Sequence, residues 1–193
     1  MRDQEWRCNG IVLVGPDVPG VRGERLDGPE EAVGLSVRVT HQFTIFADYF
    51  QFVLMDESSE DDFASIWTEE SLKRMLAVGK TAVCPGTLRN VDVVVEVHVE
   101  HTEPVVDLAV FDHVAEASVA VPSGKLVVMG CTAYLPDAPR VAINPGTYHV
   151  LSLASGIDSI KAESEPADDK YIVYLWPGAH REPRLIKHWK GDA

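Results

Sequence analysis

Three charged residues, Glu96, His98 and Glu100, stand at two-residue spacing in a stretch whose odd positions are valines. Residues two apart in a β-strand point to the same face, so these groups could together reach a divalent cation. The additional ligands and glycines of a cupin-like site are absent. We therefore predict a solvated strand face and no metal. The alternative hypothesis is a metal-dependent enzyme or metal-binding β-sandwich, with His41 or His113 as a further ligand.

Other catalytic signatures are missing from the sequence. It contains no GxSxG, HExxH, P-loop or GxGxxG motif. Cys84 and Cys131 are isolated cysteines, which in proteins are more often small buried hydrophobes than nucleophiles. We predict that the protein acts by binding a partner rather than by catalysing a reaction, and that it holds no cofactor.

The acidic segment after the second expected strand is a stronger candidate site. Five carboxylates fall within residues 56–62, and two more follow shortly after. Like charges at this density repel one another, and a basic partner would relieve the repulsion. A merely solubilising loop is the alternative, because charge runs usually lie on solvated faces. The predicted partner-binding residues are Asp56, Glu57, Glu60, Asp61, Asp62, Glu69 and Glu70.

The overall charge limits the classes of partner. The chain has 30 Asp and Glu against 17 Lys and Arg, for a formal net charge of -13. No Lys or Arg occurs between Arg38 and Lys73, or between Arg89 and Lys125. This charge repels nucleic acid and anionic lipid, so we expect neither direct DNA binding nor membrane binding. A basic protein is the expected partner.

The number of cysteines and the length of the apolar runs bear on the cellular location of the protein. Cys8, Cys84 and Cys131 are far apart and odd in number, which favours a reducing environment over a disulfide framework. The first ten residues are not those of a secretory signal, and no apolar run is long enough to span a bilayer. We expect a cytoplasmic protein.

The elements that position these candidates are mostly strands. Alternation of apolar and polar residues over 35–45 and 91–99 predicts half-buried strands, while the apolar run 50–55 predicts one buried on both faces. About eight or nine short strands with one inserted helix favour an antiparallel β-sandwich, a mainly-β fold. The remaining strands are expected at 114–121, 125–129, 141–143, 147–153 and 171–176.

One short helix is expected after the acidic segment. Thr68 can cap it, Glu69 and Glu70 suit its positive end, and Gly79 and Lys80 would end it. Leu72, Met75 and Leu76 would share its buried face. Of the tryptophans, Trp67 and Trp176 are expected to be buried and Trp189 exposed.

The composition divides the chain into three parts. Residues 1–34 are rich in Gly and Pro and form an irregular N-terminal extension, with one strand candidate at 11–14. Residues 35–178 form the β-sandwich domain. Residues 179–193 form a basic C-terminal tail.

Five segments of the chain form a recognisable set: HQFTIF (41–46), WTEESLKRMLAVG (67–79), TLRNVDVVVEVHVE (87–100), INPGTYHVLSLASG (143–156) and DKYIVYLWPG (169–178). HQFT followed by a W-T-x-E helix start is the more distinctive part. Together these segments resemble the competence protein J family of DNA-entry nuclease inhibitors, and the likeness extends over about three quarters of the chain.

The resemblance implies a β-rich cytoplasmic protein that binds and silences a DNA-degrading nuclease and has no catalytic residues of its own. The N-terminal extension and the acidic insertion make this chain longer than is usual for the family. The hypothesis is therefore a nuclease inhibitor or immunity-type protein whose acidic surface binds a nuclease or a toxin.

Overall fold

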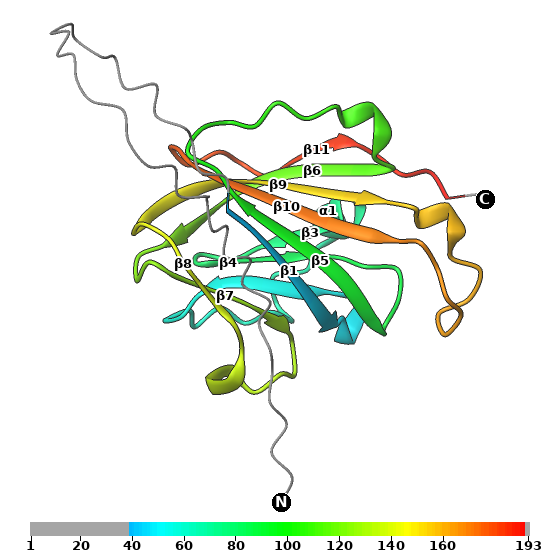
Figure 1. The fold of residues 1–193 in the computed structure, drawn as a ribbon, viewed down its shortest axis with the longest axis horizontal. Coiled ribbons are helices and arrows are strands. Elements are labelled where there is room, and N and C mark those ends of the chain that lie inside the picture. Colours follow the sequence, from blue (N-terminus) through cyan, green and yellow to red (C-terminus); the bar gives the residue numbers. More distant parts are fainter. Residues whose placement is uncertain (1–38, 192–193) are drawn as a thin grey trace, which may run out of the picture. The chain divides into compact units, whose positions relative to one another are not determined.

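The computed structural model describes residues 39–191 and arranges them in two β-sheets that face each other (Figure 1). The predicted extension 1–34, its expected strand at 11–14 and Cys8 lie outside the described residues. One six-stranded sheet has the order β1-β5-β10-β9-β6-β11, and a five-stranded sheet has the order β3-β4-β2-β7-β8. The predicted mainly-β sandwich is confirmed.

The strands of the first sheet, in spatial order, are β1 (Val39–Phe46), β5 (Asp92–Val99), β10 (Lys170–Pro177), β9 (Gly146–Ser155), β6 (His113–Val121) and β11 (Arg184–Lys187). Those of the second are β3 (Leu76–Val78), β4 (Ala82–Pro85), β2 (Phe52–Asp56), β7 (Lys125–Gly130) and β8 (Arg140–Ala142). The α-helix is α1 (Glu69–Arg74), and the 3-10 turns are η1 (Asp48–Phe50), η2 (Leu108–Val110), η3 (Leu135–Asp137) and η4 (Ile157–Ser159).

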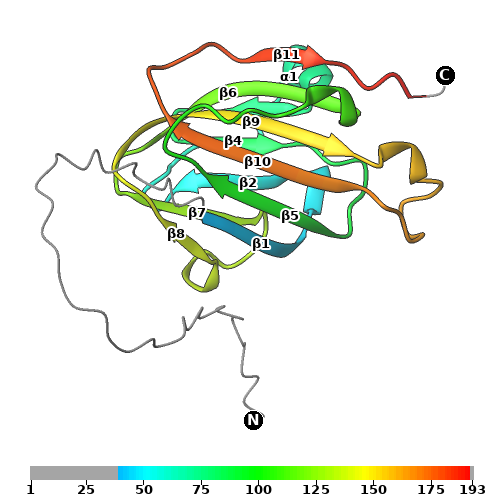
Figure 2. The same cartoon turned by 45° about the horizontal axis from the view of Figure 1, so that its top comes forward.

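The two sheets face each other (Figure 2), and the main core lies between them. Val93, Val95 and Val97 of β5 point into it, as their alternation predicts. In β2, Phe52 and Leu54 face this core, whereas Val53 and Met55 pack in a second cluster on the other side of the sheet. All five residues of β2 are buried, so the strand is covered on both faces, as expected from its apolar run.

One strand pair departs from the antiparallel pattern. β10 pairs with β5 in parallel, from Tyr171↔Val95 to Leu175↔Val99, whereas the other strand pairs within residues 39–191 are antiparallel. A parallel pair needs a long crossover connection, and the chain supplies one because β6 to β9 lie between the two strands in sequence. Local alternation of residues carries no information about this direction.

The helix is shorter than predicted. It ends at Arg74, Met75 takes the left-handed conformation at φ 48°, and Leu76 already belongs to β3. The expected end at Gly79 was wrong because residues 76–78 pair with β4, and this non-local pairing overrides the helical periodicity. The expected buried face is wrong for Leu72, which is 62% exposed.

Loops cover the outer faces of both sheets. The segment between β2 and α1 packs on the outer cluster of the five-stranded sheet through Phe63, Ile66 and Trp67. The loop between β5 and β6 packs on the outer face of the six-stranded sheet, against a cluster that contains Trp176, through Val106, Leu108 and Phe111. Trp176 is buried as predicted, and Trp67 is half-buried.

The basic C-terminal segment takes part in the fold. β11 pairs with β6 and lies beside α1 (Figure 2). This pairing brings Trp189 against the main core, where its indole Nε1 donates a hydrogen bond to Asp158. The expectation that Trp189 is exposed was therefore wrong: it is half-buried.

His113 links β6 to α1 and to the C-terminal segment. Its Nδ1 accepts a hydrogen bond from the Trp189 N–H at 3.2 Å. Nε2 therefore carries the proton, and it donates to the carbonyl oxygen of Arg74 at 2.8 Å. Burial lowers the pKa of His113, and His188 also lowers it, against the opposing effect of the Arg74 hydrogen bond.

We expect His113 to make stability fall as the solution becomes acidic. Its pKa is lower in the folded state, so its contribution is complete above the unfolded value of about 6.5 and is lost as the pH falls through the folded value. Denaturant unfolding between about pH 7.5 and pH 5 should show that His113→Gln loses less free energy of unfolding on acidification than the unaltered chain does. An equal dependence of the free energy of unfolding on pH in both proteins would contradict this role of His113. Burial also lowers the pKa values of His41 and His149, so these residues are expected to add to the pH dependence that His113→Gln retains.

Within residues 39–191, no helix has the length and apolar character needed to cross a lipid bilayer.

Candidate protein-binding surface

The first carboxylate of the acidic segment lies inside the protein. Asp56 is fully buried at the end of β2. Its Oδ1 accepts hydrogen bonds from the backbone and hydroxyl of Ser58, and its Oδ2 accepts the same pair from Ser123. Burial alone would raise the pKa of Asp56, but these hydrogen bonds outweigh it and lower the pKa. Asp56 joins two loops and is not available to a partner, which corrects its predicted role.

Asp61 has a similar structural role at the next loop. Its carboxylate accepts hydrogen bonds from the N–H of Lys80 at 2.9 Å, from the N–H of Thr81 at 2.7 Å and from the hydroxyls of Thr81 and Ser59. Burial raises its pKa, but these bonds lower it overall. A side chain at Gly79 would overlap this carboxylate, because a Cβ there would lie 2.6 Å from Asp61 Cγ. Asp61 therefore fixes the acidic segment to the turn between β3 and β4.

Glu57 is held by two cations. Its carboxylate oxygens lie 2.7 Å from Lys125 Nζ and 2.8 Å from Arg140 Nε. The hydrogen bond from Lys125 is the main cause that lowers the pKa of Glu57, followed by that from Arg140. These pairs partly neutralise Glu57, so it adds less to the negative surface than its sequence position suggests.

The remaining acidic residues of the predicted set reach solvent. Glu60, Asp62, Glu69 and Glu70 are all exposed. The predicted helix start is confirmed, because the Thr68 hydroxyl accepts the N–H of Ser71. The pKa of Glu70 is lowered by its own N–H and then by the Thr68 side chain. These four carboxylates are the exposed part of the acidic segment.

A largely apolar groove opens beside the acidic segment. It has a volume of about 1000 Å³, and its walls come from the turn at η1, the acidic segment, α1 and two later loops. Tyr49 is 73% exposed there, Leu72 62% and Phe50 47%. The lining residues are Tyr49, Phe50, Gln51, Asp61, Asp62, Phe63, Ala64, Trp67, Leu72, Met75, Thr87, Leu88, Cys131 and Thr132.

Asp48 holds the aromatic turn in place. Its carboxylate is buried and accepts hydrogen bonds from the N–H of Cys131 at 2.6 Å, from the N–H of Thr132 at 2.8 Å and from the Thr132 hydroxyl. Gly130 allows the close approach, since a Cβ there would lie 2.3 Å from the Phe46 carbonyl oxygen. The two loops are thus fixed to each other at one end of the groove.

Two polar side chains that line the groove donate their hydrogen bonds within the protein. The indole Nε1 of Trp67 donates to Gln51 Oε1 at 2.7 Å, and the Thr87 hydroxyl donates to the Arg89 carbonyl at 2.8 Å. Cys131, which lines the groove, is not an activated thiol, because burial is the main cause that raises its pKa to about 12. Burial also raises the pKa of Cys84. The groove is therefore suited to apolar contact rather than to thiolate chemistry.

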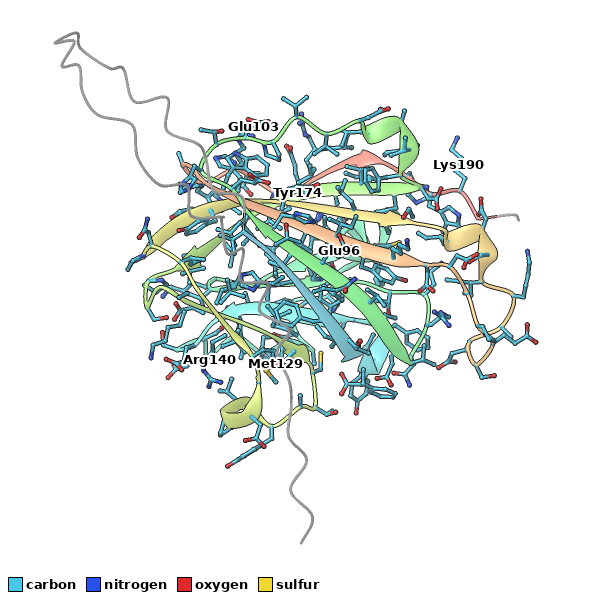
Figure 3. All side chains as sticks on the ribbon, viewed as in Figure 1. Glu96, Glu103, Met129, Arg140, Tyr174 and Lys190 are labelled. Carbon is cyan, nitrogen blue, oxygen red and sulfur yellow. The ribbon has the colours of Figure 1, made fainter. Side chains whose placement is uncertain are left out.

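The alternative metal ligands are not gathered into a site. His98 is buried, stacks on Tyr174 with ring centroids 4.5 Å apart and makes contacts with Thr40 Oγ1 at 3.0 Å and Glu96 Oε2 at 3.3 Å. Figure 3 shows Glu96 and Tyr174 on the neighbouring strands β5 and β10. Within residues 39–191, no group of three or more His, Cys, Asp or Glu side chains could hold a metal ion.

The topology explains why those ligands are separated. His41 pairs with Val97, and so faces the opposite side of the sheet from His98. His113 lies on β6, which β10 and β9 separate from β5. The polar face of β5 was expected to be exposed to solvent. This is correct for Asp92 but wrong for His98, which is buried.

Sequence reasoning missed the groove. It assigned Phe50 to a strand and Leu72 to a buried helix face, and it left Tyr49 without a role. The available signal was the aromatic pair Tyr49 and Phe50, which lies after the expected strand 35–45, at the start of the apolar run. An aromatic pair alone does not reveal whether the side chains face solvent.

Comparisons with known proteins identify the fold. No protein-family model and no curated protein matches the chain. Among solved structures, ComJ from Bacillus subtilis, an inhibitor of the DNA degrading activity of NucA, is similar with a TM-score of 0.54 and 15% identity, over 74% of this chain and 97% of that chain. Crocagin biosynthetic gene J is similar with a TM-score of 0.52 and 20% identity, over 74% of this chain and 99% of that chain. The chain therefore has a ComJ-like fold, as its resemblance to the competence protein J family implied.

Proposed function

We propose that this chain is an inhibitor or immunity-type protein that binds and silences a DNA-degrading nuclease or toxin, without catalysing a reaction itself. The observation that carries the proposal is the ComJ-like fold, since ComJ inhibits the DNA degrading activity of NucA. Within the described residues, no cluster of side chains fits a metal ion, and the pKa values of the Cys84 and Cys131 thiols are raised. Neither observation supports an enzyme.

The proposed contact surface is the exposed part of the acidic segment. A nuclease must bind the phosphate backbone of DNA, which Lys and Arg side chains neutralise. Glu60, Asp62, Glu69 and Glu70 place carboxylates on the surface within a short stretch of chain, and they would occupy the positions of phosphates in such a basic groove. The net charge of -13 adds long-range attraction to the same partner.

Neutralising the exposed carboxylates is expected to slow association. The triple variant Glu60→Gln, Asp62→Asn, Glu69→Gln should bind a nuclease from the same cell about tenfold more slowly at low salt, with a smaller change in dissociation. Raising the ionic strength should slow the unaltered protein in the same way, and the two effects should be less than additive because salt then has less charge to screen. Stopped-flow or surface-binding kinetics at two salt concentrations measure both rates.

A matched control separates a local surface from the total charge. The variant Glu103→Gln, Glu163→Gln, Glu182→Gln removes the same charge from exposed positions in other loops. It should associate nearly as fast as the unaltered protein. An equal slowing in both triple variants would assign the effect to net charge, and a failure to inhibit any nuclease would reject the proposed function.

A further inference from the structure

The groove beside the acidic segment has the composition of an anchor site in a protein interface. Interfaces obtain most of their binding energy from a few large side chains buried in pockets and surrounded by a polar rim. Here Tyr49, Phe50 and Leu72 are exposed around the groove, and none of its lining residues within the described part of the chain, 39–191, is Lys or Arg. Asp62 is at its edge, and Glu69 and Glu70 are in the same helix as Leu72.

Backbone strain is concentrated at this groove. Within residues 39–191, three residues other than glycine have a positive φ: Tyr49 at 55°, Phe50 at 59° and Met75 at 48°. All three line the groove. Bulky residues rarely adopt this conformation, and such strained positions cluster at functional sites. Asp48 maintains the strain at Tyr49 and Phe50 through its hydrogen bonds to the loop at Cys131 and Thr132.

We infer that this groove binds an extended segment of a protein partner that presents one or two large apolar side chains flanked by Lys or Arg. The inference rests on the proposed function and names the chemistry of the partner at that site. Trp67 and Thr87 have their donors paired internally, so the floor selects an apolar group. The exposed carboxylate of Asp62 in the lining, together with Glu69 and Glu70 on the helix that carries Leu72, favours basic flanking residues. A volume of about 1000 Å³ accommodates more than a single side chain.

Synthetic peptides test the chemistry without the natural partner. The probe is a labelled octapeptide with a central Trp-Leu pair between Lys and Arg residues. Two control peptides replace Trp-Leu with Ser-Ser, or Lys and Arg with Glu. Fluorescence anisotropy should give binding of the first peptide at least about tenfold tighter than either control. No binding of the first peptide, or equal binding of a control, overturns the inference.

Three variants place the binding site. Leu72→Ala and Tyr49→Gly should each weaken binding of the first peptide by about five- to tenfold. Glycine adopts a positive φ without strain, so Tyr49→Gly should melt at a temperature no lower than the unaltered chain, and its weaker binding is then not a folding defect. Val105→Ala changes a fully exposed residue in the loop after β5 and should bind normally. Equal loss in Val105→Ala overturns the inference.

The same variants separate this inference from the proposed function. If Leu72→Ala and Tyr49→Gly still inhibit a nuclease fully while the acidic triple variant does not, the groove is not the anchor site and the inhibitor function stands. If the chain inhibits no nuclease but binds the first peptide selectively, the groove inference stands and the proposed function falls. Self-association that Leu72→Ala abolishes would assign the groove to a second copy of the chain and overturn the inference.

Discussion

Replacing Arg89 with alanine is expected to lower the free energy of unfolding by about 3–5 kcal/mol, because it leaves a buried carboxylate without its counter-charge. Arg89 forms an ion pair with Asp169, whose side chain is completely buried. A second guanidinium nitrogen donates to the Glu165 carbonyl at 2.9 Å. Arg89 precedes β5 and Asp169 precedes β10, so the pair joins the loops that enter these two neighbouring parallel strands.

Denaturant unfolding with a linear extrapolation measures the change. Arg184→Ala is the matched control, because Arg184 also pairs with a carboxylate, Glu116 at 2.9 Å, but is 69% exposed. Exposed pairs contribute about 0–1 kcal/mol, so this variant should be nearly as stable as the unaltered chain. Arg89→Leu combined with Asp169→Leu should recover much of the lost stability, since no unpaired charge remains. Equal effects of Arg89→Ala and Arg184→Ala would contradict the structural role of the buried pair.

Asp56→Ala is expected to cost about 3 kcal/mol of stability, although its sequence position suggested a surface role. The carboxylate accepts hydrogen bonds from Ser58 and Ser123, and bonds to a charged acceptor contribute roughly 1.5–3 kcal/mol each without being additive. Because the pKa of Asp56 is lowered in the folded state, this contribution is present above its unfolded pKa. It is lost as the pH falls through the folded pKa.

Comparison with Asp62 makes this prediction specific. Asp62→Asn changes an exposed residue whose hydrogen bond to the Ala64 N–H an asparagine can retain, so stability should change by less than about 0.5 kcal/mol. Thermal and denaturant unfolding of both variants at neutral and acid pH give the comparison. The difference between Asp56→Ala and the unaltered protein should shrink in acid. If Asp62→Asn is the more damaging variant, the assignment of structural and exposed carboxylates is wrong.

The acidic segment contains a structural group of carboxylates and an exposed group that we propose binds the partner. Asp56 and Asp61 bind to other loops and hold the segment on the fold, whereas Glu60 and Asp62 remain at the surface. Variants of the first group should change stability, and variants of the second should change the rate of association. A charge count over the sequence cannot make this division.

Much of the fold was predictable from local patterns. Alternating valines in β5 indicated a strand with one face in the core, and the apolar run of β2 indicated burial on both faces. Thr68 marked the start of the helix correctly. These signals are reliable because side chains alternate with a period of two in strands and because a cap needs only residues within one turn. The ends of elements were less predictable, as the early end of α1 at Arg74 shows.

The amino-acid sequence by itself determined that the chain is acidic, mainly β and able to form a sandwich, because composition and alternation are local properties. Tertiary structure alone decided which carboxylates are exposed. Ser123, which donates hydrogen bonds to the buried Asp56, lies 67 residues further along the chain. The residues that line the groove come from five separate segments between Tyr49 and Thr132. Burial and shape depend on contacts between distant residues, and those contacts follow from strand order and pairing direction. A single sequence does not encode them in any local pattern.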